Sequence, residues 1–136
     1  MKASPMVWTG RVLSGLFVLF MLGASIAPKF LMPEAGATYI RSLNIDAADV
    51  PMIGAIELMG TLLYAWRRTS LLGAVWMTAL LGGAIATHLH VDSPLFSHTL
   101  FGVYLGLVMW GGLWLRDPSL RGLLPIRRRV RCAPGR

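Results

Sequence analysis

Four long apolar runs constrain the fold of this chain more than any other feature. They extend over about Val12–Ala27, Val50–Trp66, Thr69–Leu89 and Pro94–Leu115, and the first can begin as early as Trp8. Each is close to the roughly 17–25 residues that carry a helix across the hydrocarbon core of a bilayer. A spanning segment must satisfy its own backbone hydrogen bonds, and these runs lack the alternation of barrel strands. The sequence therefore predicts an all-α integral membrane protein with helices over about 8–27, 50–66, 69–89 and 94–115.

The composition excludes the main alternatives to a membrane fold. Hydrophobic residues make up 55% of the chain and charged residues 14%, against roughly 45–50% and 25% in soluble domains. A small soluble globule has too little interior to bury so much apolar surface, and a disordered chain would be far more polar. We expect one transmembrane domain over residues 1–124, followed by a basic tail over residues 125–136.

The connections between the runs predict how the helices are arranged. The links near Arg67 and near Asp92 are very short, so consecutive helices should be antiparallel neighbours in an up-down four-helix bundle. The only sizeable loop covers residues 28–50, where a short interfacial helix over 37–43 would place Tyr39 at headgroup level. The motif Gly102-Val-Tyr-Leu-Gly106 permits close helix contact, either within the bundle or between two copies.

The distribution of charge predicts the orientation in the membrane. The net charge is +7, and it is concentrated before the first helix, at the second junction and in the tail: Lys2, Arg11, Arg67, Arg68, Arg116, Arg121, Arg127, Arg128, Arg129, Arg131 and Arg136. The positive-inside rule then places both termini in the cytoplasm. Because the arginines gather at helix ends rather than on a polar face, we expect no nucleic-acid partner.

The ends of the chain raise two smaller questions. The first run resembles a signal peptide with small residues at Ala24–Ala27, but Pro28 would follow the cut directly, so we expect a retained helix. Cys132 is the only cysteine. It forms no intramolecular disulfide, and the chain has no dithiol pair for redox exchange.

Ionisable residues inside apolar runs are costly in a bilayer and mark candidate functional positions. Glu57 lies more than one helical turn past Pro51, well inside the second run. A lone carboxylate at that depth is either protonated and hydrogen-bonded to a neighbouring helix or part of a site with a cation or several donors. Lys29 closes the first run, and its long stem can reach back into the bundle.

The histidines lie on either side of the turn between the third and fourth helices. His88 and His90 point about 200° apart on a helix, so we expect His88 to face the bundle and His90 the interface. The residues expected to form a polar pocket in the outer half are Lys29, Glu57, Thr61, His88, His98 and Tyr104. Within this set Glu57 and His88 are the candidate catalytic pair. Lys29, Glu57, His88, His98 and Tyr104 are the candidate ligand-binding residues, with Thr61 and Tyr104 at the floor.

Motifs for other chemistries are weak or missing. Three histidines without a tight spacing indicate no metal site, and haem between His88 and His98 is disfavoured by the short turn that joins their helices. The sequence contains no HExxH, no P-loop and no GxSxG. A conventional hydrolase or a nucleotide-driven pump is therefore not indicated.

Four stretches together resemble one family. Ala27-Pro-Lys-Phe30, Ile53-Gly-Ala-Ile-Glu-Leu-Met-Gly-Thr-Leu-Leu-Tyr64, Leu81-Gly-Gly-Ala-Ile-Ala-Thr-His-Leu-His90 and Pro94-Leu-Phe-Ser-His-Thr-Leu-Phe101 are similar to the corresponding helix segments of DoxX-like membrane proteins. The resemblance covers about residues 11–124. It implies a multi-pass protein of the bacterial inner (plasma) membrane, with Lys29, Glu57 and His88 at motif positions. It also implies association with redox enzymes such as thiosulfate:quinone oxidoreductase, or a role in assembly.

Three functions agree with these observations. The first is a quinone-linked redox subunit, in which His and carboxyl groups serve a quinone and a partner protein supplies the electrons. The second is a non-catalytic accessory or assembly subunit that contacts a membrane protein partner, or a second copy, through glycine-rich helices. The third is a small-molecule or proton carrier, for which four helices without an inverted repeat are poorly suited unless they oligomerise.

Overall fold

The computed structural model of the chain describes residues 4–123, and within this range it contains helices and turns but no strand. Four helical spans are long and apolar enough to cross a membrane: Pro5–Leu31, Ala47–Ala65, Ser70–His90 and Leu95–Arg116. The predicted all-α class with four transmembrane helices is thus confirmed. Lys2, Cys132 and the tail over 125–136, on which part of the charge argument rests, lie outside the described residues.

The first span is longer than expected and is built from three segments. These are α1 (Pro5–Phe20), the π-helical η1 (Met21–Ile26) and α2 (Ala27–Leu31). The helix begins before Trp8 because the Ser4 side chain accepts a hydrogen bond from the Val7 amide and Pro5 occupies the first turn, a position that proline tolerates well. The loop that follows contains α3 (Pro33–Ser42), which includes most of the predicted interfacial helix, and the short η2 (Ala47–Asp49).

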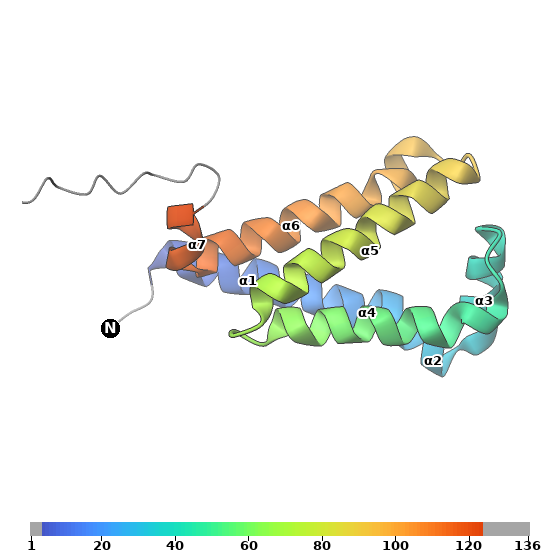
Figure 1. Ribbon diagram of the computed structural model, residues 1–136, viewed down its shortest axis with the longest axis horizontal. Coiled ribbons are helices and arrows are strands. Elements are labelled where there is room, and N and C mark those ends of the chain that lie inside the picture. The colour runs from blue at the N-terminus through green and yellow to red at the C-terminus, as the bar shows by residue number, and fades with distance from the viewer. Residues whose placement is uncertain (1–3, 124–136) are drawn as a thin grey trace, which may run out of the picture.

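The remaining spans follow the predicted order. They comprise α4 (Val50–Ala65), α5 (Ser70–His90), and the π-helical η3 (Leu95–Thr99) followed by α6 (Phe101–Arg116); a short α7 (Pro118–Leu123) completes the described chain. Consecutive spans run antiparallel, and each span packs on its neighbours in a closed ring, with α1 against α6 as the most extensive contact (Figure 1). Both ends of the described chain lie at one end of the bundle, where Arg121 Nη1 donates to Met6 Sδ at 3.4 Å. Which side of the membrane this end faces stays a prediction.

Glycine allows two pairs of helices to approach closely at this end. A Cβ on Gly73 of α5 would lie 2.2 Å from the Tyr64 amide nitrogen of α4, and a Cβ on Gly10 of α1 would lie 2.5 Å from the Arg116 amide nitrogen of α6. A side chain at either glycine would force the two helices of that pair apart. The Gly102–Gly106 motif packs inside the bundle as well, since a Cβ on Gly102 would lie 2.9 Å from Ile85 Cγ1.

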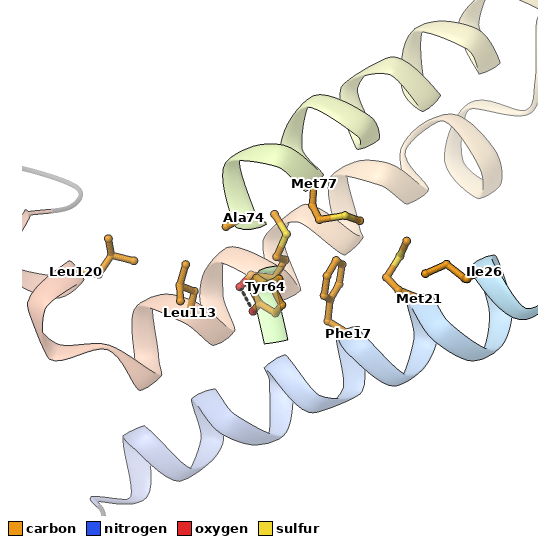
Figure 2. Close-up of a cluster of buried hydrophobic side chains, with 9 residues drawn as sticks. Phe17, Met21, Ile26, Tyr64, Ala74, Met77, Leu113 and Leu120 are labelled. Carbon is orange, nitrogen blue, oxygen red and sulfur yellow. Dashed lines mark hydrogen bonds between the residues drawn. The ribbon is translucent and has the colours of Figure 1, made fainter. Parts of the chain in front are cut away.

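The buried core is centred in the same half of the bundle and extends along the first span to Met21 and Ile26. Buried Tyr64 is its centre, with Phe17 edge-on at 5.2 Å between ring centroids (Figure 2). The Tyr64 hydroxyl donates to the Met109 carbonyl at 2.8 Å and lies 3.0 Å from Ser14 Oγ. Arg116 donates to the Tyr64 carbonyl at 3.0 Å and lies over its ring. These contacts join α1, α4 and α6 around one side chain.

Candidate functional site

A large cavity occupies the other half of the bundle, away from the two ends of the chain. Its volume is about 1000 Å³, and its walls are mostly apolar side chains from the four spans and from α3. Four of the predicted site residues line it: Lys29, Glu57, His88 and His98. The structure therefore brings together residues that are as much as 69 positions apart in the sequence numbering (29 to 98).

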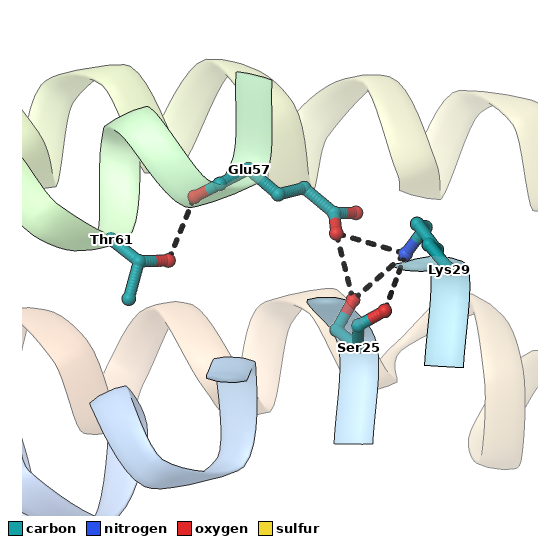
Figure 3. Close-up of polar contacts among 4 residues, drawn as sticks. All are labelled: Ser25, Lys29, Glu57 and Thr61. Carbon is teal, nitrogen blue, oxygen red and sulfur yellow. Dashed lines mark hydrogen bonds and ion pairs between the residues drawn. The ribbon is translucent and has the colours of Figure 1, made fainter. Parts of the chain in front are cut away.

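One wall of the cavity carries a polar cluster formed by Ser25, Lys29 and Glu57 (Figure 3). Lys29 Nζ lies 2.8 Å from Glu57 Oε2, with the two side chains 9% and 16% exposed. Lys29 Nζ also donates to the Ser25 carbonyl at 2.9 Å and to Ser25 Oγ at 3.1 Å, and Ser25 Oγ donates to Glu57 Oε2 at 3.0 Å. No hydrogen bond from the described residues reaches the second carboxylate oxygen, Glu57 Oε1.

The π-helical segment η1 explains how Ser25 enters this cluster. Pro28 has no amide hydrogen and cannot continue the α-helical pattern in this part of the span. The helix instead widens, and the Ala27 amide bonds to the Leu22 carbonyl five residues back. Such π-bulges occur frequently at functional sites because they reposition backbone and side-chain groups. Here the Ser25 carbonyl and hydroxyl both face the Lys29 ammonium.

A second polar cluster at the cavity is centred on His88. The His88 side chain is buried, and its Nε2 lies 3.1 Å from the Tyr39 hydroxyl while its Nδ1 lies 3.1 Å from Ser93 Oγ. The rings of His88 and His98 are 5.9 Å apart. His90 is exposed. The prediction that His88 faces the bundle and His90 faces outward is confirmed.

Tyr39 and Ser25 are the site residues that the sequence reasoning missed. The headgroup level expected for Tyr39 stays a prediction, whereas its part in the site was not predicted: its hydroxyl reaches His88 and the residue lines the cavity. Burial raises the pKa of the Tyr39 hydroxyl above its ordinary value of 10.0, and the charge of Glu57 raises this pKa further. Ser25 could have been found, because it precedes Lys29 by four residues and so shares its helix face.

Two expected floor residues lie elsewhere. Tyr104 is 47% exposed and is not among the residues that line the cavity. Thr61 is fully buried, and its hydroxyl donates to the Glu57 carbonyl at 2.8 Å rather than into the cavity. Apolar residues such as Met21, Met77 and Leu105 line the cavity. Across residues 4–123 no group of three or more His, Cys, Asp or Glu side chains is placed to hold a metal ion.

Four apolar spans around a cavity with two polar walls define a small multi-pass helical membrane protein. The sequence model of the DoxX-like family matches residues 12–112. The match covers more than half of the chain, so the protein belongs to the DoxX-like family. No curated protein and no solved structure matches the chain.

The Tyr39 hydroxyl offers a direct test of the charge on Glu57. Ultraviolet difference titration between the wild type and Tyr39→Phe should show Tyr39 ionising only above pH 10, and Glu57→Gln should lower that pKa because the neighbouring negative charge is gone. The neutral phenol is favoured by folding, so its contribution to stability is lost as the pH rises from 10 through the folded pKa. An unchanged Tyr39 titration in Glu57→Gln would show that Glu57 is uncharged in the folded protein.

Proposed function

We propose that this DoxX-like protein is a quinone-linked subunit of a redox complex in a bacterial inner membrane, and that its cavity binds the quinone headgroup. The observation that carries the proposal is that two polar clusters, one around Glu57 and one around His88, lie at the same mostly apolar cavity. A quinone suits such a cavity, because its flat apolar ring bears two oxygens that can each take part in a hydrogen bond. Predominantly apolar pockets with a few convergent polar groups are typical of small-molecule sites.

The free carboxylate oxygen gives Glu57 a specific part in this proposal. Glu57 Oε2 is held by Lys29 and Ser25, which leaves Oε1 able to accept a hydrogen bond from a quinol hydroxyl. When the quinol is oxidised, its two hydroxyl protons and two electrons must leave. Glu57 can take one proton, and the His88 cluster can take the other. The electrons pass to a redox partner protein, and the reverse reaction returns protons by the same groups.

Lys29 supports Glu57 in two ways. Its ammonium compensates a negative charge that would otherwise be costly inside a membrane. Its three hydrogen-bond donors are directed to the Ser25 carbonyl, Ser25 Oγ and Glu57 Oε2, which fixes the carboxylate in one orientation. The polar cluster is therefore preorganised, which reduces the entropic cost of binding a ligand.

The second candidate function is an accessory or assembly subunit without a small ligand of its own. Several glycines face outward and are free of close neighbours, since a Cβ on Gly15, Gly23 or Gly111 would meet nothing within 4 Å. Such positions permit close approach by the helix of a partner. The cavity and its two polar clusters have no part in this function, and for that reason we favour the quinone proposal.

Native mass spectrometry of protein extracted in mild detergent from its own host tests the proposal. We expect the wild type to retain quinone, and His88→Phe to lose about 90% of it, because removal of a buried hydrogen-bonding partner costs about 1–3 kcal/mol. His90→Phe is the matched control, since His90 is on the same helix but exposed. It should retain quinone at the wild-type level.

The other outcomes of this experiment distinguish the quinone proposal from the accessory function. A stoichiometric membrane partner without quinone would favour the accessory function. Equal loss of quinone from His88→Phe and His90→Phe would contradict a role for the His88 cluster in binding. Thermal denaturation of both variants, followed by tryptophan fluorescence, identifies any loss that comes from misfolding.

A further inference from the structure

We infer that the cavity is entered sideways from the bilayer, between α4 and α5, and that its ligand therefore carries a long hydrocarbon tail that remains in this opening. The inference rests on the proposed function and specifies its substrate class as a membrane-dissolved, polyprenyl-type quinone rather than a small water-soluble quinone. It follows from which sides of the cavity are closed and which side is not.

Three sides of the cavity are closed by direct contacts between neighbouring spans. Between α1 and α6, the rings of Phe20 and Phe101 meet edge-on at 5.5 Å. Between α5 and α6, Gly102 lies directly against Ile85. The side between the first span and α4 is closed by the Lys29–Glu57 ion pair and by Phe30, whose ring lies 2.9 Å from the place of a Cβ on Gly54.

The fourth side is closed only near the packed core. There Gly73 lies against Tyr64, and Trp76 Nε1 donates to the Ile56 carbonyl at 3.2 Å. Beyond Trp76, the described residues form no hydrogen bond or ring contact between α4 and α5, and α5 turns away from α4 toward the end where α3 lies (Figure 1). At that end the Tyr39–His88 hydrogen bond crosses from α3 to α5.

The residues along this side are suited to a passage in contact with lipid. Ala79 and Gly83 on α5 line the cavity and are also exposed at the surface of the bundle. Both are small, and a Cβ on Gly83 would meet nothing within 4 Å. No charged residue of α5 lies between Trp76 and His88. An apolar chain can pass here without the desolvation cost that a polar ligand would pay.

The size of the cavity agrees with a ligand that is longer than its headgroup. A cavity of about 150 Å³ holds one benzene molecule, whereas this one encloses about 1000 Å³. Most of its lining residues are apolar, so a single ring placed beside the polar clusters leaves most of the apolar wall uncovered. A hydrocarbon tail covers that wall and continues through the opening into the bilayer.

The experiment compares a tailed and a tail-less quinone on matched variants in lipid nanodiscs. Gly83→Leu narrows the passage, while Gly82→Leu places the same side chain at the adjacent position, which does not line the cavity. We expect Gly83→Leu to weaken the binding of decylubiquinone about tenfold, the effect of losing roughly two buried methylene groups. It should weaken the binding of tail-less ubiquinone-0 less than about twofold, and Gly82→Leu should affect neither ligand.

The other outcomes distinguish a failure of the proposed function from a failure of the lateral entrance. If the wild type binds neither quinone, the proposed function fails and the inference fails with it. If the wild type binds decylubiquinone and Gly83→Leu binds it equally well, the proposed function stands and the lateral entrance is wrong. Equal weakening of both quinones would place Gly83 at the headgroup instead. Ala79→Leu, one turn closer to Trp76, repeats the test if Gly83→Leu does not fold.

Discussion

Replacing Glu57 with glutamine is expected to lower quinone-dependent electron transfer in host membranes by about 10²–10⁴-fold, the range typical of losing a positioned proton-transfer group. Glutamine keeps the size of the side chain and can still accept a hydrogen bond from Lys29 through its amide oxygen. It cannot take a proton from a quinol hydroxyl. The rate is measured as quinone reduction or quinol oxidation in membranes from a deletion strain that carries each variant at equal level.

The control for this substitution is Glu34→Gln. Glu34 lies in the first turn of α3 and is exposed, so the same chemical change there should leave the rate unchanged. A structural role for the ion pair is tested separately with Lys29→Met combined with Glu57→Met, which removes both charges from the bundle. If the pair is only structural, the double variant should recover both stability and activity; under our proposal it recovers stability alone. Wild-type activity in Glu57→Gln would overturn the proposed role of Glu57.

The second large effect concerns stability. Gly73→Ala is expected to destabilise the protein by about 1–3 kcal/mol, the usual cost of forcing an extra group into a well-packed core. The added Cβ would lie 2.2 Å from the Tyr64 amide nitrogen and 2.5 Å from Tyr64 Cα. Since these are backbone atoms, α4 and α5 must separate. A lower midpoint of thermal unfolding in detergent measures the loss.

Gly82→Ala is the matched comparison for this prediction. Gly82 is on the same helix, but a Cβ there would meet nothing within 4 Å. Alanine is also the better helix former, so we expect no loss of stability. Equal destabilisation by both substitutions would show that glycine serves the flexibility of α5 rather than its contact with α4.

The sequence predicted the fold well because the apolar runs are long and uninterrupted. Their lengths alone require four spanning helices, and the short links at residues 67–68 and 91–93 leave an antiparallel ring as the simplest arrangement. The inward orientation of Lys29, Glu57 and His88 was also predictable, because an ionisable side chain is costly where a helix faces lipid. All three line one cavity.

The details that the sequence did not predict depend on irregular backbone. The sequence did not predict the two π-helical segments, Met21–Ile26 in the first span and Leu95–Thr99 at the start of the fourth. Regular helical periodicity does not describe either. The contact of Tyr39 with His88 was not predicted, because the path of α3 depends on tertiary contacts with α2 and α4. Tyr104 was expected at the floor of the pocket, but its side chain is 47% exposed and does not line the cavity.

The contacts that hold the helices together and the polar residues that line the cavity are concentrated at different ends of the bundle. Tyr64, Ser14 and Arg116 fasten three helices at one end, while the other end holds the cavity. Although Met21 and Met77 belong to both regions, substitutions at positions that share no partner usually have additive effects. The cavity end can therefore change its side chains without weakening the end that keeps the helices together. Such a design gives a small membrane protein an evolutionary freedom: one stable scaffold can acquire different ligands, since function resides in sites rather than in folds.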